Sequence, residues 1–124
     1  GNHLRNGGPS NSGSGIMLGD GGGSNQLARG NVLVDPGQVG IGVAGGDNVR
    51  VLDNLIYSSS LPWSNVGIYA WNFGAGCGQV EIAGNRVNWT AAGGYANGFW
   101  NGGGCSLSEY GNDWNANLGP GIFD

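Results

Sequence analysis

The sequence contains no lysine and little charge of any kind. Charged residues make up 10% of its 124 residues, and four arginines stand against eight acidic residues, for a net charge of −4. Nucleic acids and anionic membrane surfaces are bound by clustered lysine and arginine, so neither is expected as a partner. The sequence also lacks an apolar run of the roughly 18 to 20 residues that a membrane-spanning helix needs.

Glycine and proline together account for 33 residues, a share that indicates disorder in a chain without a repeat. Five tryptophans, four tyrosines and three phenylalanines are too many for a solvated linker. The length suits a single domain, 1–124, either a mature chain or a piece excised from a longer multidomain protein. A domain of this size buries only about two-thirds of its unfolded surface, so its core is expected to be thin and reinforced.

The strongest regularity is an asparagine with fixed neighbours. Five copies stand 29, 23, 31 and 27 residues apart, and a large apolar residue follows each by two places. They are "GNHL", "GNVL", "DNLI", "GNRV" and "GNDW", with Asn2, Asn31, Asn54, Asn85 and Asn112. A second series falls between them: "GIML" at 15, "GIGV" at 40, "GIYA" at 67 and "GFWN" at 98. Each repeat therefore holds at least two short strands, and no stretch shows a helical period.

Short strands that repeat without helices predict a solenoid, in which equivalent strands of successive coils stack into parallel sheets about 4.8 Å apart. The asparagines are then expected to stack at one corner as an amide ladder. In this pattern nearly the whole chain resembles the right-handed parallel β-helix repeat superfamily, the pectate-lyase-like fold. The resemblance implies an all-β, right-handed parallel β-helix of about four coils. Lyases, glycoside hydrolases, epimerases, phage tailspikes and carbohydrate-binding modules share this fold, so it implies no single activity.

The stacking register also predicts charge pairs between adjacent coils. Arg50 and Glu81 each lie four residues before a ladder asparagine, and Arg86 and Asp113 each follow one directly. Both pairs are expected to be structural, because exposed ion pairs contribute only about 0 to 1 kcal/mol.

The two cysteines, Cys77 and Cys105, are 28 residues apart, close to one coil length. Adjacent coils bring their Cα atoms within the roughly 4.4 to 6.8 Å of a disulfide. We expect a buried inter-coil disulfide and therefore a secreted, extracellular or periplasmic protein. A metal or redox role is disfavoured, because there is no C-x-x-C and the single histidine, His3, is distant in sequence.

Catalytic groups are scarce. Enzymes that resemble this fold use clustered aspartates, often with Ca²⁺, or a basic proton abstractor, or a Gly-His-Gly segment, and the sequence has none of these. Asp20 in "GDGGGSN" and Asp47 in "GGDN" are weak candidates for Ca²⁺, but solvated turn aspartates are the simpler interpretation; no other cofactor is implied. The register opposes no two free carboxyl groups at the roughly 5 to 9.5 Å that glycoside hydrolysis needs.

The aromatic residues suggest a binding surface. In "GIYAWN", strand alternation sends Ile68 inward and Tyr69 and Trp71 outward. "GFWN" is equivalent one coil later, so Phe99 is expected inside and Trp100 outside, beside Tyr69. Flat aromatic faces on a rigid sheet suit the C–H faces of pyranose rings. The predicted carbohydrate-binding residues are Tyr69, Trp71, Trp100, Asn72, Asn101 and Trp63, with Asn97 as a further hydrogen-bonding amide.

The alternative to an exposed strip is a covered one, because the loops at 58–66 and 90–98 are long enough to fold over it. Trp89 and Trp114 are instead expected in the core or at the end of the solenoid.

The sequence thus predicts a secreted, non-catalytic carbohydrate-binding module that recognises a plant-type or bacterial polysaccharide, similar to xylan or β-glucan, and serves an attached glycoside hydrolase. The first alternative is a catalytic fragment of a β-helix polysaccharide lyase or glycoside hydrolase, with Asp20, Asp47 or Asp53 at its site. The second is a stalk or adhesin segment whose open coil ends pair with other chains.

Overall fold

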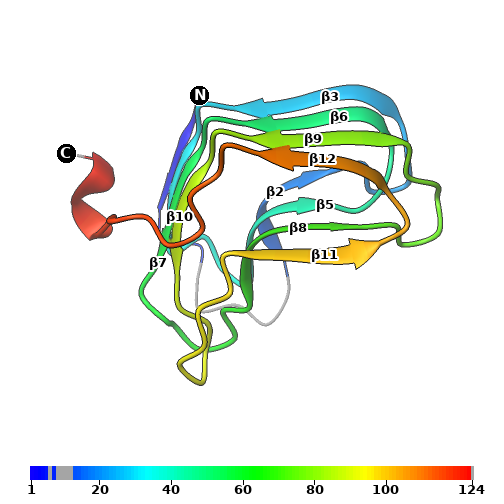
Figure 1. Cartoon of the computed structure of the whole chain (residues 1–124). Helices are drawn as coiled ribbons and strands as arrows, with labels where there is room; N and C mark the ends of the chain where they lie inside the picture. The colour runs from blue at the N-terminus through cyan, green and yellow to red at the C-terminus, as the bar shows by residue number, and fades with distance from the viewer. Residues whose placement is uncertain (6, 8–12, 124) are drawn as a thin grey trace.

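The chain winds into about four stacked coils, each contributing one strand to each of three parallel sheets (Figure 1). The structure is a computed structural model, and it describes residues 1–5, 7 and 13–123. The first sheet is ordered β1 (His3–Arg5), β4 (Val32–Val34), β7 (Leu55–Ser58) and β10 (Arg86–Trp89). The second is ordered β2 (Ser14–Leu18), β5 (Val39–Val43), β8 (Val66–Trp71) and β11 (Phe99–Gly103). The third is ordered β3 (Ser24–Arg29), β6 (Asp47–Leu52), β9 (Gln79–Ala83) and β12 (Ser106–Tyr110).

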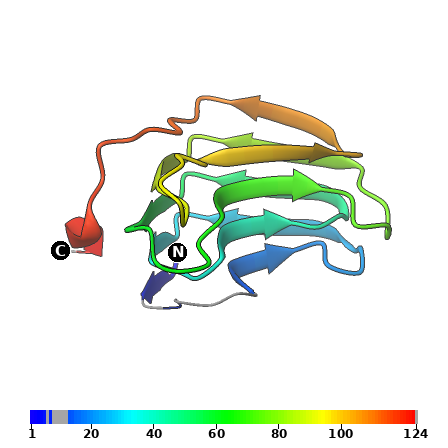
Figure 2. The same ribbon diagram turned by 90° about the horizontal axis from the view of Figure 1, so that it is seen from below.

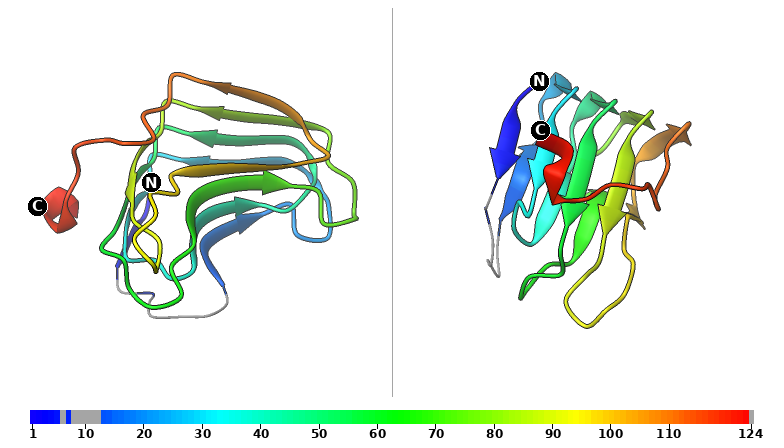
Figure 3. Two further views of the ribbon diagram at one scale, coloured as in Figure 1. Left: turned by 60° about the horizontal axis from the view of Figure 1, so that its bottom comes forward. Right: turned by 90° about the vertical axis from the view of Figure 1, so that its left-hand side faces the viewer.

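All strand pairs in the three sheets are parallel, which confirms the predicted β-helical solenoid. The views in Figures 2 and 3 show the strands of successive coils lying side by side along the solenoid. After the last coil, the chain ends in a 3-10 helix, η1 (Pro120–Phe123), which lies against β4 and β7 of the first sheet.

The asparagine ladder is present at the corner before the first sheet. In each step, the backbone N–H and the side-chain Nδ2 of one asparagine donate to the Oδ1 of the next, at 2.8 to 3.2 Å. The ladder runs through all five predicted residues, Asn2, Asn31, Asn54, Asn85 and Asn112. Asn54 and Asn85 are fully buried, so each ladder bond satisfies amide groups that have no access to water.

The glycines of the second repeated series let the first and second sheets approach closely. A Cβ atom on Gly40 would lie 3.0 Å from Cγ2 of Ile56, and one on Gly67 would lie 2.6 Å from Cγ1 of Val87. Gly98 is similarly close to Trp114, with 3.0 Å to its Cβ. The carbonyl oxygen of the equivalent glycine on the next coil is also close, at 2.3 Å from the Gly40 position and 2.7 Å from the Gly67 position. Glycine therefore precedes the inward residue of this sheet because the next coil and the side chains packed against it occupy the space that a Cβ would need.

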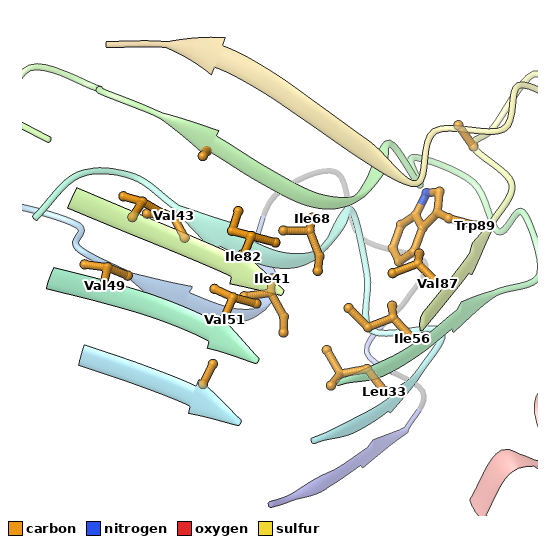
Figure 4. Packing of buried hydrophobic residues seen from close by; sticks show 14 residues of the cluster. Leu33, Ile41, Val43, Val49, Val51, Ile56, Ile68, Ile82, Val87 and Trp89 are labelled. Atoms are coloured by element: carbon orange, nitrogen blue, oxygen red, sulfur yellow. The ribbon is translucent and has the colours of Figure 1, made fainter. Parts of the chain in front are cut away.

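The core lies between the three sheets and consists mainly of small branched aliphatic side chains, together with Trp89 (Figure 4). The expected inward row of the second sheet is in register, with Ile41 paired to Ile68 and Ile68 to Phe99. At the last coil Phe99 stacks on Trp114, with centroids 4.8 Å apart and an interplanar angle of 13°. The interpretation of Trp89 as core and of Trp114 as an end residue is therefore confirmed.

The predicted disulfide is formed. Cys77 and Cys105 are joined with their Cα atoms 4.7 Å apart, and they connect the turn between β8 and β9 to the turn between β11 and β12. Both cysteines are half-buried, so the expectation of full burial is wrong: the bond lies at a corner that faces solvent on one side.

The predicted charge pairs are neighbours but do not form ion pairs. Arg50 pairs in register with Glu81, and Arg86 with Asp113. In the described part of the chain, neither pair comes within 4.0 Å. Glu81 instead accepts a hydrogen bond from the hydroxyl of Tyr110 on the next coil. On this exposed face, the weak Coulomb attraction does not hold two long side chains together.

A different, exposed ion pair is formed near the ladder. Nε of Arg29 lies 3.9 Å from Oδ2 of Asp53. This contact engages Asp53, one of the three aspartates considered for a catalytic site.

Candidate functional site

Four aromatic rings form one cluster on the outer face of the second sheet, and we call Tyr69, Trp71, Phe73 and Trp100 the aromatic patch. Tyr69 pairs in register with Trp100 of the next coil and with Gly42 of the previous one. This confirms the predicted alignment of Tyr69 beside Trp100. The sequence analysis missed Phe73, although the two-residue spacing from Tyr69 through Trp71 continues to it.

Each ring of the patch contacts two of the other three. Trp71 lies between Phe73 and Trp100, with centroid distances of 4.2 and 5.4 Å. Tyr69 lies 6.0 Å from Phe73 and 6.4 Å from Trp100. All four interplanar angles fall between 52° and 66°. Edge-to-face and tilted contacts of this kind are favourable between aromatic rings, but they give a ridged surface and not the flat strip that we expected.

Tyr69 points outward as predicted, yet it is not exposed: only 6% of it is accessible to solvent. It packs with Val39 and Val66, and its hydroxyl donates to Sδ of Met17 at 3.5 Å. The expectation that Tyr69 is exposed is therefore wrong, because neighbouring side chains close over its ring. Burial, and to a smaller extent the Asp20 carboxylate, raises the pKa of Tyr69 above its usual value.

The solvent-facing part of the patch consists of Trp71, Phe73 and Trp100, which are 38%, 58% and 48% exposed. Gly102, in the irregular pairing between β11 and β8, makes this arrangement possible. A Cβ atom there would lie 2.6 Å from Cγ of Trp71 and 2.9 Å from Cη2 of Trp100. The loops at 58–66 and 90–98 leave these three rings exposed, so the alternative of a covered strip does not hold for them.

The two amides predicted to bind sugar hydroxyls have local structural roles. Oδ1 of Asn72 accepts from the backbone N–H groups of Gly74 and Gly76, at 2.8 and 3.2 Å. Oδ1 of Asn101 accepts from N–H of Gly103 at 3.0 Å. Both side chains therefore stabilise turns through their oxygen, as asparagine does in many turns, and these bonds leave the two Nδ2 groups unused.

Two shallow hollows adjoin the patch, and Trp100 lines both of them. The first has a volume of about 280 Å³ and is lined by Asn65, Val66, Asn97, Phe99 and Trp100. The second has a volume of about 230 Å³, and its lining includes Met17, Val39, Tyr69, Trp71, Phe73 and Trp100, with Asn65 and Gln38 at its polar edge. Both hollows thus combine apolar surface with side-chain amides, which is the usual composition of a small-molecule site.

Trp63, the sixth predicted binding residue, lies on the 58–66 loop with a φ of 75° and is 60% exposed. Within the part of the chain that the structure describes, its ring makes no aromatic contact with the patch. It is therefore separate from the cluster.

Asp20 and Asp47, the candidate metal ligands, belong to different segments of the chain. Asp20 lies in the turn after β2, whereas Asp47 begins β6 and its Oδ1 accepts from N–H of Gln79 at 2.9 Å. Among the residues described, no group of three or more histidine, cysteine, aspartate or glutamate side chains is placed to hold a metal ion.

The sheet that carries the patch has no charge of its own. Its strands read "SGIML", "VGIGV", "VGIYAW" and "FWNGG", whereas Arg29, Arg50 and Arg86 lie on the other two sheets. The chemistry available on this face is therefore ring stacking, apolar contact and neutral hydrogen bonding.

Comparisons of the chain with protein-family models, with curated proteins and with solved structures give no match. In the described residues, no helix has the length and hydropathy needed to cross a membrane. The functional assignment therefore depends on the geometry of the site.

Proposed function

We propose that this protein is a non-catalytic carbohydrate-binding module of a secreted protein, and that it binds a neutral polysaccharide similar to xylan or β-glucan through the aromatic patch. In this proposal it belongs with the carbohydrate-binding members of the pectate-lyase-like β-helices and targets an attached glycoside hydrolase to its substrate. The Cys77–Cys105 disulfide supports a location outside the reducing cytoplasm.

The observation that carries the proposal is the exposure of three large rings on a rigid, uncharged sheet. Phe73 and Trp100 each contact the ring of the buried Tyr69, and Trp71 contacts the rings of Phe73 and Trp100. Contiguous exposed aromatic surface on a small protein usually marks a binding site. Because the rings are already ordered before binding, little conformational entropy is lost when a sugar stacks on them.

The absence of charge from these strands favours a neutral polymer over an acidic one. A uronic-acid chain presents a carboxylate on each sugar, and proteins recognise carboxylates best with arginine. The carboxylate of Asp20 acts on Tyr69 of the patch and would repel an acidic chain.

The catalytic alternative lacks a comparable arrangement. Asp53 contacts Arg29, Asp47 binds a backbone N–H, and Asp20 lies in a separate turn. Glycoside hydrolysis needs two carboxyl groups facing each other across one sugar, and none of these contacts supplies such a pair.

A binding screen tests the proposal. Purified protein is incubated with insoluble and soluble xylans, β-glucans, mannans and polygalacturonate, and the bound fraction is measured alongside reducing sugar and unsaturated products. We expect retention on at least one neutral polysaccharide and no product release. The Trp100→Ala variant should lose retention, whereas Tyr110→Ala, which removes an exposed ring of the third sheet, should keep it. Absence of retention on every polymer, or release of product, would overturn the proposal.

A further inference from the structure

Trp100 contributes to the lining of both hollows of the site. Val66, the first residue of β8, and Asn65, which precedes it, also border both hollows. The hollows are therefore adjoining parts of one site. Each, at about 280 and 230 Å³, is smaller than the roughly 300 Å³ at which pockets for drug-sized ligands begin, so each suits a single ring.

The amides at the edge of the hollows differ from those that stabilise turns. Asn65 and Asn97 use their backbone groups in the coil: N–H of Asn65 donates to the Gln38 carbonyl, and the Asn97 carbonyl accepts from N–H of Gly67. Within the described residues, their side-chain amides form no hydrogen bond. Each amide therefore presents a free donor and a free acceptor beside the aromatic surface.

The placement of these amides is fixed by the solenoid. Asn65 lies on the coil beside Gln38, and Asn97 lies on the next coil, where it borders the first hollow together with Phe99 and Trp100. Because the two asparagines come from successive coils, they are separated in the direction in which the coils stack. Both border the first hollow, and Asn65 also borders the second, so a chain that fills the two hollows passes both amides.

Resting on the proposed function, we infer that the site binds at least two consecutive neutral sugar units, one in each of the hollows that Trp100 borders, and that Asn97 and Asn65 bind their hydroxyl groups. The unit in the first hollow contacts Phe99 and Trp100 and hydrogen-bonds to Asn97. The unit in the second hollow lies on Trp71 and Phe73. Asn65, which borders both hollows, binds hydroxyls near the linkage.

Oligosaccharide length provides the first test. Xylo- and cello-oligosaccharides of one to six units are titrated against the intact protein by calorimetry. Stacking of a second ring contributes about 1 to 3 kcal/mol by analogy with base stacking, so affinity should rise about 5- to 150-fold from the monosaccharide to the disaccharide. Later steps should be smaller once both hollows are filled. An affinity that is the same for one unit as for longer chains overturns the two-unit site.

Amide variants provide the second test. Asn97→Ala and Asn65→Ala each remove side-chain hydrogen bonds, and each should lower affinity for the preferred oligosaccharide about 2- to 10-fold. Asn117→Ala is the matched control, because Asn117 is an exposed asparagine of the C-terminal segment, outside both hollows. Circular dichroism and the midpoint of thermal unfolding verify that each variant is folded. Since Asn65 is exposed, its variant tests the inference even if Asn97→Ala is destabilised.

The outcomes separate this inference from the proposed function. If the wild type binds none of the polysaccharides, the proposed function itself is wrong. If the wild type binds and depends on Trp100, but both asparagine variants bind as tightly as Asn117→Ala, the function stands and the assignment of Asn65 and Asn97 is wrong. Equal affinity for oligogalacturonates would contradict the neutral character of the ligand.

Discussion

The ring of Tyr69 lies directly over Gly42, its partner on the preceding coil. A Cβ atom on Gly42 would come within 2.6 Å of Cε2 and Cζ of Tyr69 and within 2.7 Å of its hydroxyl oxygen. The ring can lie flat across β5 and reach Met17 on β2 only because the residue beneath it has no side chain. Tyr69 is therefore the base of the aromatic patch, with Phe73 and Trp100 over it.

Gly42→Ala should displace this ring and destabilise the protein. The added methyl group overlaps a ring that its neighbours hold in place, and overpacking of this kind typically costs about 1 to 3 kcal/mol. Gly119→Ala is the control, because a Cβ there would meet no atom within 4 Å, and its effect should stay within about 0.5 kcal/mol. Urea unfolding measures both; equal midpoints for the two variants would show that the Tyr69 ring moves aside freely.

Tyr69 should also make stability depend on alkaline pH. Its pKa is raised in the folded protein, chiefly by burial, so above about pH 10 the unfolded chain loses this proton before the folded chain does. The folded state then binds more protons, and the free energy of unfolding falls as pH rises through this range. Tyr110, whose hydrogen bond to Glu81 raises its pKa, acts in the same direction.

The contribution of Tyr69 can be isolated by measuring urea unfolding from pH 8 to 11 for the wild type, Tyr69→Phe and Tyr110→Phe. We expect Tyr69→Phe to flatten the decline while keeping the fold, because the ring is retained. Spectroscopic titration of tyrosinate should show the corresponding late-titrating group disappear. An unchanged decline in Tyr69→Phe would mean that this hydroxyl titrates like an exposed one.

The fold was predictable because each coil requires the same residue types at the same backbone positions. A ladder asparagine is needed once per coil, and Gly40 and Gly67 recur where a side chain of another sheet fills the space of their Cβ. Such constraints repeat with the coil, so their spacing reveals the register. The disulfide followed from the same spacing, because its two cysteines lie one coil apart.

The details of the site were less predictable, because they depend on how side chains fold over one another. Alternation gave the outward direction of Tyr69, but no sequence pattern indicates that Phe73 and Trp100 close over it. Likewise, Asn72 and Asn65 look equivalent in the sequence. Only the structure shows that Asn72 binds the N–H groups of its own turn whereas Asn65 borders both hollows.

The middle of the asparagine ladder should be far more sensitive to substitution than its end. Oδ1 of Asn54 accepts from both N and Nδ2 of Asn31, each at 2.9 Å, and both residues are buried. Asn54→Ala leaves two buried donors without a partner, at about 1 to 3 kcal/mol each, so we expect a loss of about 3 kcal/mol or more. Denaturant unfolding measures this loss.

Asn2→Ala is the comparison for the ladder. Asn2 is exposed, and its backbone N–H would still donate to Oδ1 of Asn31 after the substitution. Its cost should therefore stay below about 1 kcal/mol. If both substitutions cost the same, the ladder would not be the reason for the asparagine repeat.

Reduction of the disulfide should destabilise the fold without abolishing the ladder. The bond between Cys77 and Cys105 closes a loop with a sequence separation of 28 residues, for which the chain-entropy treatment gives about 3 to 4 kcal/mol. Unfolding of the wild type with and without reductant, and of Cys77→Ser/Cys105→Ser without it, should show the same decrease. Thiol titration of the denatured, unreduced protein should find no free cysteine; two free thiols would show that the bond does not form.

Trp100 and Tyr69 should respond in opposite ways to truncation, because one ring faces the ligand and the other supports it. Trp100→Ala removes a side chain that is 48% exposed. We expect its free energy of unfolding to fall by no more than about 1 kcal/mol, while polysaccharide binding weakens by about 1 to 3 kcal/mol, the scale of one lost stacking contact.

Tyr69→Ala removes a ring that is 6% exposed and lies beneath Phe73 and Trp100. It should destabilise the fold by about 3 to 5 kcal/mol, as truncation of buried aromatic residues does. Thermal unfolding and calorimetric titration of both variants against the retained polysaccharide measure the contrast. If Trp100→Ala instead unfolds the protein while binding survives in Tyr69→Ala, the two roles are reversed, and the exposed rings are part of the fold and not a binding surface.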